Sequence, residues 1–273
     1  MTLRPGPKRH AGTFTDMTTP TPPPDARALL RDPRFLVPRA PSGGAPGTMR
    51  WLRGAVPRFS NGPAHARRRA LAEAELRRLD PSRLREAART ATRGAAAPDA
   101  APHVPVAVLG AALGARGDVV PATRAVAAAY RPGASPELTA RADEGVRTLM
   151  GLLPDGEPES VANRIGLLVQ TCDATAALIT GALERAAEGR WRGCVEELLT
   201  DTLLLSPPVR ATWRVAGAGA RLNGRPVPEG TEVPLDLAAA RAPFGDGVRP
   251  CPGSRHALAL ACGVLDVLLE EKA

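Results

Sequence analysis

The spacing of apolar residues predicts a chain built mainly from helices. Helical periodicity begins at Asp25, and residues 63 to 93 have the pattern of one or two amphipathic helices separated near Asp80-Pro81. Residues 104 to 114 are almost entirely apolar, but they are shorter than the ~18 residues that a membrane span requires. They therefore predict a helix buried inside the protein.

The second half of the chain carries the longest apolar pattern. Between Ser160 and Glu188, Ala and Leu recur at helical spacing, with Gln170, Asp173 and Thr175 embedded among them. The other elements that the pattern predicts are helices at 121–130, 136–153 and 191–205, strands at 211–216, 220–222 and 231–235 around an Asn223-Gly224 turn, and a last helix from Gly253 to about Glu270.

Residues 1 to 24 differ from the rest, because they are rich in Pro, Thr and Arg and carry too little apolar surface to stay ordered. We expect a disordered tail there. Met17 as the true start of the protein is a hypothesis that N-terminal sequencing of the native protein tests. Residues 25 to 273 are expected to form a single domain.

Composition supports this picture and limits the environment. Hydrophobic residues make up 44% of the chain but aromatic ones only 3%, so the core must consist of Ala, Leu and Val, which favours helices over a sandwich or barrel. The four cysteines form no C-x-x-C pair and no zinc-type spacing. With no apolar signal core, we expect a cytoplasmic protein without a membrane anchor.

A formal charge of +8 is compatible with nucleic acid, an anionic cofactor or an acidic protein partner. The basic residues are spread along the chain without a nucleic-acid-binding signature, and one Tyr with four Phe leaves little for base stacking. We therefore expect no nucleic-acid partner.

The residues with the clearest chemistry lie around Cys251, in Phe244-Gly-Asp-Gly-Val-Arg-Pro-Cys251-Pro-Gly253. A cysteine between a glycine-rich loop and a helix N-terminus faces backbone N–H groups, which lowers the pKa of the thiol and suits a soft metal ligand. The other interpretation of a lone cysteine is a small buried hydrophobe.

This run resembles the cysteine-loop motif Phe-Gly-x-Gly-x-Arg-x-Cys-x-Gly of the cytochrome P450 family. The resemblance implies a P450-like fold, mainly α with a small β component, and haem b with Cys251 as the axial iron ligand. Phe244, Gly245 and Gly253 would surround the cofactor, as in the family.

A second resemblance lies in Gly166-Leu-Leu-Val-Gln-Thr-Cys-Asp-Ala-Thr175, which is similar to the family's long central helix. There an acid and an alcohol deliver protons to bound dioxygen. Asp173 matches the acid, but the alcohol position is Ala174 and Thr175 comes one residue late. Asp173 and Thr175 are the candidate catalytic residues, and a surface or capping acid is the alternative for Asp173.

Four cations match family positions that bind the haem propionates. His65 and Arg69 stand four residues apart and so share one helix face. Arg214 and Arg249 are similar to the strand arginine and to the arginine two residues before the cysteine. For each residue taken singly, a solvated charge is the better interpretation; their joint occurrence in the family's order favours a cofactor site.

The chain also departs from the family. Ala238 to Phe244 connects the last strand directly to the cysteine loop, so the family's meander is absent, and Glu197-Leu-Leu-Thr200 lacks the arginine of the Glu-x-x-Arg motif. We expect Glu197 to be exposed or to contact another cation, since a buried unpaired carboxylate is costly. Less chain is also present for a substrate lid.

These features leave three hypotheses open. The first is a haem-thiolate monooxygenase, or a peroxide-using relative, that oxidises a small organic substrate of secondary metabolism with electrons from a ferredoxin-type partner. The second is a catalytically impaired, P450-like helper protein for a partner enzyme such as a glycosyltransferase. The third is a decayed product that never folds stably.

Overall fold

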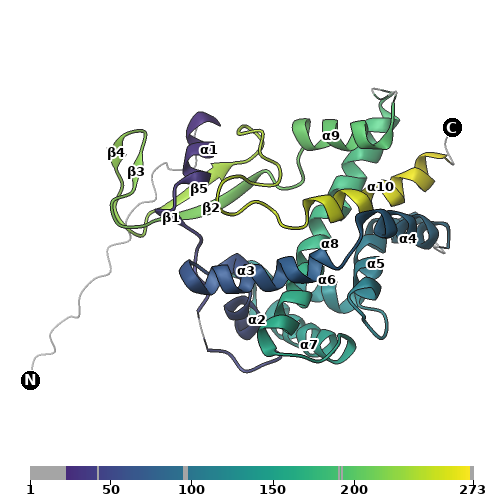
Figure 1. Cartoon of the computed structure of the whole chain (residues 1–273), viewed down its shortest axis with the longest axis horizontal. Coiled ribbons are helices and arrows are strands. Elements are labelled where there is room, and N and C mark those ends of the chain that lie inside the picture. The colour runs from purple at the N-terminus through teal and green to yellow at the C-terminus, as the bar shows by residue number, and fades with distance from the viewer. Residues whose placement is uncertain (1–22, 42, 95–97, 190, 192, 271–273) are drawn as a thin grey trace, which may run out of the picture.

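A computed structural model describes residues 23–41, 43–94, 98–189, 191 and 193–270 (Figure 1). The expected N-terminal tail lies outside the described residues up to residue 22, and helix α1 begins at Pro23. The helices are α1 (Pro23–Arg31), α2 (Met49–Ala55), α3 (Gly62–Arg77), α4 (Pro81–Arg93), α5 (Val104–Ala112), α6 (Val120–Ala128), α7 (Pro136–Leu152), α8 (Pro158–Ala187), α9 (Val195–Leu205) and α10 (Ser254–Glu270), with short 3-10 helices at Pro57–Phe59 and Pro98–His103.

Helix α8 runs through the middle of the helical part (Figure 1). It begins with Pro158, whose fixed φ favours a first helical position, and continues for 30 residues. Its buried side chains include Ile165, Leu168 and Ile179, and it contacts α3, α5, α6, α9 and α10. The long apolar pattern in the sequence is therefore the central core helix.

Among the described helices, α8 is the one long and apolar enough to cross a membrane by length and composition. However, 56% of its most apolar window is buried against the rest of the protein. This burial is the signature of a core helix packed inside a globular fold.

The strands are β1 (Phe35–Leu36), β2 (Ala211–Ala216), β3 (Arg221–Leu222), β4 (Arg225–Pro226) and β5 (Glu232–Asp236). One sheet has the antiparallel order β1-β2-β5, and β3 pairs with β4. Helix α1 packs Leu29 and Leu30 in one apolar cluster with Val233 and Leu235 of β5. The mainly α architecture with a small β component agrees with the sequence prediction.

Most predicted elements are present, with small changes at their ends. The Asn223-Gly224 turn has φ values of 51° and 75°, as a tight type I′ hairpin turn requires. The break at Asp80-Pro81 is also confirmed, because the Asp80 side chain accepts a hydrogen bond from the Ser82 N–H and caps α4. Helix α2, which the sequence pattern did not reveal, starts where Thr48 caps the Trp51 N–H.

The chain passes from β5 to the cysteine loop through one compact turn. Arg241 adopts φ 51°, and the Ala242 N–H donates to the Leu237 carbonyl at 2.9 Å. The guanidinium of Arg27 in α1 donates to the carbonyls of Ala240 and Arg241 at 2.8 and 2.9 Å. The sequence predicted that no meander lies between the last strand and the cysteine loop, and this short turn connects the two.

Helix α10, which follows the cysteine loop, is fixed against α4 and α9. Arg85 of α4 forms two hydrogen bonds to Asp266 at 2.8 and 2.9 Å and a further ion pair with Glu196 of α9. Gly263 faces the backbone of Arg85 so closely that a Cβ atom would collide with the Arg85 carbonyl. The α4–α10 contact thus depends on the absence of a side chain at Gly263 and on the half-buried ion pair between Arg85 and Asp266.

Candidate functional site

The cysteine loop closes on itself as a preformed hairpin. The Cys251 N–H donates to the Phe244 carbonyl at 2.8 Å, and the Gly245 N–H donates to Ala242 at the same distance. Gly245 and Gly247 have φ values of +73° and +69°, which favour glycine. A Cβ at Gly247 would also collide with the backbone of α1. Gly245 and Gly247 are therefore required by the loop itself.

Cys251 stands just before the N-terminus of α10. Its side chain is exposed to solvent, but it forms part of the wall of an open hollow of about 530 Å³, so many protein atoms surround it. Burial raises the pKa of the Cys251 thiol, while the backbone N–H of Gly253 and the Arg69 guanidinium act in the opposite direction. The expected lowering of this pKa is therefore wrong for the metal-free thiol, because loss of hydration outweighs the helix N-terminus.

Arg249 lies two residues before the cysteine and is held by the segment before α3. Its Nη2 donates to the Ser60 carbonyl at 2.8 Å and to Asn61 Oδ1 at 2.9 Å. Burial, and then the charge of Arg69, lower the pKa of Arg249 to about 10. Arg69 in turn donates to the Pro250 carbonyl at 2.7 Å, which joins α3 to the cysteine loop.

Arg214 is the most deeply buried of these cations, with 5% of its surface exposed. Its Nη1 donates to Thr212 Oγ1 at 3.2 Å and to the Trp213 carbonyl at 3.0 Å. Burial, followed by the charges of Arg249 and Arg58, lowers the pKa of Arg214 to about 10. No carboxylate of the described residues forms an ion pair with it.

His65 completes the group. Burial lowers the pKa of His65 to about 4, and the charges of Arg249 and Arg69 act in the same direction, opposed by Glu73. Glu73 is also the carboxylate that pairs with Arg69, at 2.5 Å. The structure therefore brings together the four residues predicted as cations, with His65 uncharged near neutral pH, and we call His65, Arg69, Arg214 and Arg249 the cation cluster.

The cation cluster is short of negative charge, and this fits haem b, which carries two carboxylates. Within the described residues, Glu73 faces the cluster, whereas Arg214 and Arg249 keep their charge in a partly dehydrated place without a carboxylate. Such burial is costly unless an anion arrives. The cysteine loop, which contacts the cluster through Arg69 and Arg249, supplies the soft ligand that iron would need.

The two candidates on α8 do not lie together. Asp173 is exposed and its charge acts on His103, whereas Thr175 is 3% exposed and buried in the core. Residues two apart on a helix point about 200° apart, so one turn cannot aim both at one ligand. Asp173 also affects the buried thiol of Cys172, whose pKa burial raises to about 11.

Glu197 is exposed, as expected for a carboxylate without its family arginine. Its Oε2 accepts a hydrogen bond from the Cys194 backbone N–H at 3.3 Å and completes a capping box at the start of α9. Glu197 therefore has a local structural role at the start of α9.

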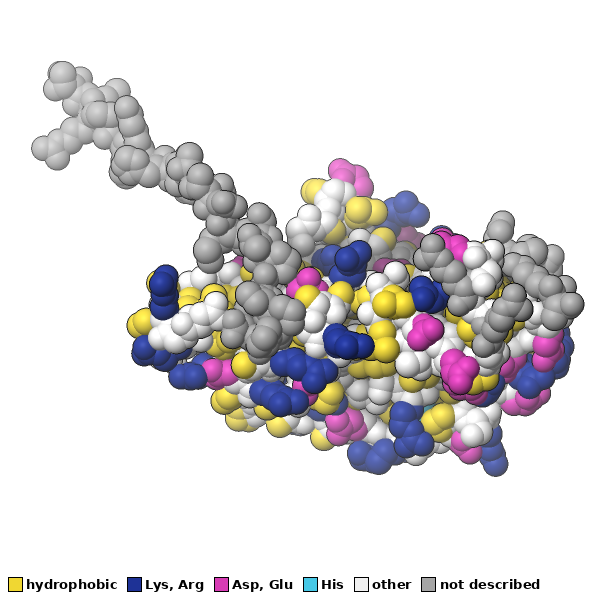
Figure 2. Space-filling model, turned by 90° about the horizontal axis from the view of Figure 1, so that it is seen from above, with side chains coloured by type: hydrophobic (Ala, Val, Ile, Leu, Met, Phe, Trp, Pro, Cys, Tyr) yellow, Lys and Arg dark blue, Asp and Glu magenta, His cyan; other side chains and the backbone are white. Residues whose placement is uncertain are grey.

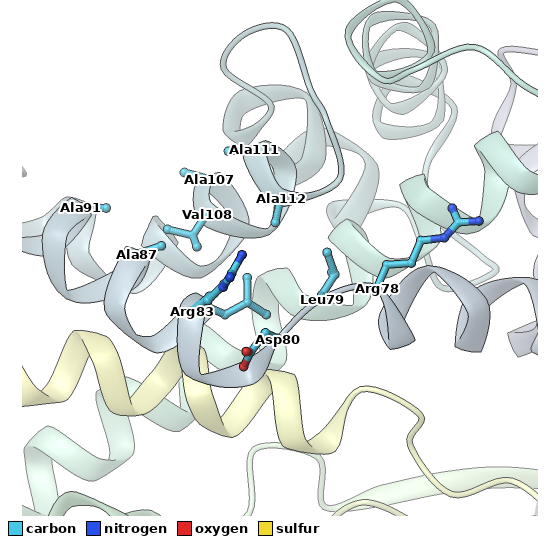
Figure 3. A pocket seen from close by; sticks show the side chains of 11 residues that line it. Arg78, Leu79, Asp80, Arg83, Ala87, Ala91, Ala107, Val108, Ala111 and Ala112 are labelled. Atoms are coloured by element: carbon cyan, nitrogen blue, oxygen red, sulfur yellow. The ribbon is translucent and has the colours of Figure 1, made fainter.

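Two open hollows stand out on the surface. One is the hollow beside Cys251, lined by α3, α10 and Pro81. The other measures about 520 Å³ and lies between α4 and α5; Figure 3 shows its alanine-rich walls with Arg83 and Asp80 at one end. Neither hollow is lined by a residue of α8.

The α8 surface near Gly166 is covered by side chains instead. Val56 is fully buried beside Gly166, and the Tyr130 hydroxyl approaches the same glycine with no hydrogen-bond partner among the described residues. Phe59 packs edge-on against Tyr130 with ring centroids 5.3 Å apart. The segment carrying Val56 and Phe59 therefore fills space next to the central helix.

The sequence missed the residues that organise the cluster. Asn61 and Ser60 bind Arg249, and Arg58 adds a further positive charge near Arg214. Asn61 immediately precedes α3, in the N-cap position, where a capping role is the ordinary expectation. Only the fold reveals that its side chain binds Arg249 instead.

No known family profile matches the chain. Protein TylM3 of Streptomyces fradiae is 33% identical over 110 residues, which cover 36% of this chain and 26% of that protein. The match therefore spans about a quarter of the relative's length.

Solved structures match over far more of the chain. P450BioI, crystallised in complex with hexadec-9Z-enoic acid ligated acyl carrier protein, matches with a TM-score of 0.75 and 16% identity over 91% of this chain and 83% of that one. A thermophilic cytochrome P450 from Sulfolobus tokodaii gives 0.68 and 19% over 90% and 84%. Cytochrome P450 CREJ, in complex with (4-ethylphenyl) dihydrogen phosphate, gives 0.71 and 15% over 92% and 83%.

Proposed function

This chain has the cytochrome P450 fold in a shortened form, and we propose that it is a haem-thiolate monooxygenase that oxidises a small organic substrate of secondary metabolism. The observation that carries the proposal is the contact between the cysteine loop and a cation cluster in which Arg214 and Arg249 form no ion pair with a carboxylate of the described residues. An anionic cofactor with a soft metal at its centre would supply both the negative charge that the cation cluster lacks and the metal that the cysteine would bind.

The chain's own residues would hold haem b from two sides. Cys251 is the iron ligand, and its pKa, raised in the metal-free thiol, would fall on coordination because the metal stabilises the thiolate. The cation cluster would bind the two propionates, with Phe244, Gly245 and Gly253 near the sulfur. Bound haem with a thiolate ligand supplies the activation of dioxygen or peroxide.

Proton supply would depend on Asp173. Its carboxylate is exposed, so it can exchange protons with water at one face of α8. Thr175, which the family resemblance made a second candidate, is buried on another face, and Ala174 has no hydroxyl. The geometry therefore favours Asp173 over Thr175 as the residue that delivers protons, with water in place of the alcohol.

An acidic, ferredoxin-type partner fits the face beside Cys251. Arg69, Arg77, Arg255 and His256 line the hollow there, against Glu73 as its acidic residue. Electrostatic attraction would guide such a partner to the ligand side of the iron. Elsewhere basic residues are dispersed: Figure 2 shows Arg side chains alternating with acidic and apolar side chains on the face seen from above. We place the protein in the cytoplasm, where such partners are found.

The test is the difference spectrum of the reduced, carbon-monoxide-bound protein after loading with haem. We expect a thiolate-type Soret band for the wild type and its loss in Cys251→Ser. Cys194→Ser is the matched control, because Cys194 is also exposed and precedes a helix. A haem-loaded wild type without the thiolate band would refute the proposal.

A second function is favoured by the filled space beside α8. Val56, Phe59 and Tyr130 occupy the region next to Gly166, and neither open hollow reaches α8. The region is also held tightly: Arg53 of α2 donates to the carbonyls of Ala129, Tyr130 and Arg131. Such packing leaves little room for a substrate and supports a helper protein for a partner enzyme such as a glycosyltransferase.

Replacement of the iron ligand separates the two functions. A Cys251→Ala protein that supports full biological function in the producing cell would identify a helper, whereas loss of function would identify the haem enzyme. The binding of a carrier protein by P450BioI, which shares this fold, supports the idea that the fold accommodates protein partners.

A further inference from the structure

Asn61 is the residue immediately before α3, in the N-cap position, but its side chain does not cap the helix. Its side chain is 6% exposed and makes no hydrogen bond to the first turn of the helix. Instead Oδ1 accepts from the Val37 N–H at 3.1 Å, and Nδ2 donates to the Val37 carbonyl at 2.9 Å. The amide thus pairs with the backbone beside β1 much as a neighbouring strand would.

The same Oδ1 accepts a second hydrogen bond, from Nη2 of Arg249 at 2.9 Å. The Ser60 carbonyl binds that nitrogen at 2.8 Å, so two neutral oxygens from adjacent residues hold one corner of the guanidinium. Arg249 is the cation that links the cluster, since its charge acts on both Arg214 and His65. Fixing Arg249 therefore fixes the centre of the cluster.

A neutral amide is the group that this position needs. Aspartate has nearly the same shape, but it would lose the donor to the Val37 carbonyl and would form an ion pair with Arg249. The ion pair would neutralise the positive charge of Arg249, which would then no longer attract the carboxylate of an incoming cofactor. Asparagine keeps Arg249 in place and leaves its charge available.

We propose that Asn61 is a positioning residue that orients Arg249 without neutralising it, and so sets how strongly the cation cluster holds the carboxylates of an anionic cofactor. The identity of that cofactor as haem rests on the proposed function. The arrangement of Asn61, Arg249 and His65 does not, and it can be measured in the haem-free protein.

The first measurement is the titration of the His65 ring by NMR in haem-free wild type, Asn61→Asp and Asn61→Ser. Beside Arg249, Arg69 and Glu73, His65 should titrate well below its usual range in the wild type. Asn61→Asp should raise the pKa by about one unit, because its carboxylate offsets Arg249, whereas uncharged Asn61→Ser should change it far less. Equal values in the wild type and Asn61→Asp would overturn the proposal.

The second measurement is the rate of haem loss to an excess of apomyoglobin. Asn61→Ala should accelerate loss about fivefold in the wild-type background, because Arg249 is no longer aimed, and less than about twofold in Arg249→Gln. Equal acceleration in both backgrounds would mean that Asn61 only supports the fold, which contradicts the proposal.

The two measurements also separate this proposal from the proposed function. A wild type that takes up no haem, together with the expected change at His65, would refute the haem enzyme and support the role of Asn61. Should Asn61→Asp fail to fold, the haem-loss comparison of Asn61→Ala in the wild-type and Arg249→Gln backgrounds carries the test, and equal acceleration in both would overturn the proposal.

Discussion

The charge of Arg249 acts on the buried guanidinium of Arg214, and within the described residues neither side chain forms an ion pair with a carboxylate. Like charges near each other in a dehydrated place destabilise a folded protein. The arrangement is understandable if a ligand provides the missing negative charge. The same unpaired charges therefore lower the stability of the ligand-free protein and favour the binding of an anionic ligand.

Replacing Arg214 should therefore have opposite effects on the two states. Arg214→Met keeps the length of the side chain and removes the charge, so we expect the haem-free protein to gain about 1 to 3 kcal/mol. Haem binding should weaken at the same time. Urea unfolding with and without hemin measures both effects. Arg210→Met is the control, because Arg210 is exposed, and a loss of stability in haem-free Arg214→Met would contradict the prediction.

His65 should make the haem-free protein less stable in acid. Its pKa is about 4 in the folded chain, below the usual 6.5, so the folded state binds the proton more weakly than the unfolded state. The associated stability is complete above pH 6.5 and is lost as the pH falls toward 4. The pKa of His103 is also lowered and contributes with the same sign.

His65→Gln should therefore reduce the slope of unfolding free energy against pH in that range without abolishing it. Chemical unfolding at a series of pH values measures the slope. An unchanged slope would show that His65 is not held near Arg249 and Arg69.

The close contact between α4 and α10 should make Gly263 intolerant of a side chain. Gly263→Ala places a Cβ against the Arg85 carbonyl and the Ala88 side chain, so we expect a loss of about 1 to 3 kcal/mol. Gly151→Ala in α7 is the matched control. Among the described residues, no atom beyond the neighbouring backbone of α7 lies within 4 Å of its added Cβ, and alanine should stabilise that helix by about 0.5 to 1 kcal/mol. Thermal unfolding distinguishes the two signs.

Arg85 should contribute more than the exposed arginines do. Its removal leaves the Asp266 carboxylate, 10% exposed, without its two hydrogen bonds, so Arg85→Met should cost about 1 to 3 kcal/mol. Arg78→Met should cost less than about 0.5 kcal/mol, because Arg78 is 73% exposed and pairs only with Glu75. Similar losses in the two variants would refute the special role of the α4–α10 ion pair.

Sequence patterns predicted the parts of the site that depend on local order. The cysteine loop could be predicted because its glycines, Arg249 and Cys251 lie within ten residues, and His65 and Arg69 because they are one helical turn apart. The contact of Arg249 with Asn61 spans 188 residues, so no local pattern contains it. Helical geometry alone predicts that the side chains of Asp173 and Thr175 point in different directions. The family resemblance rests on the types of these residues and not on the directions of their side chains.

The short turn between β5 and the cysteine loop has a consequence for the order of assembly. Hydrogen bonds within residues 237–242 and from Arg27 anchor one end of the loop, and α10 anchors the other, so little chain entropy remains to be lost there. Folding can then finish before any cofactor arrives. We expect the apoprotein to fold cooperatively and to accumulate before the cofactor binds. Cofactor insertion should then be a late step whose rate depends on how much cofactor is available.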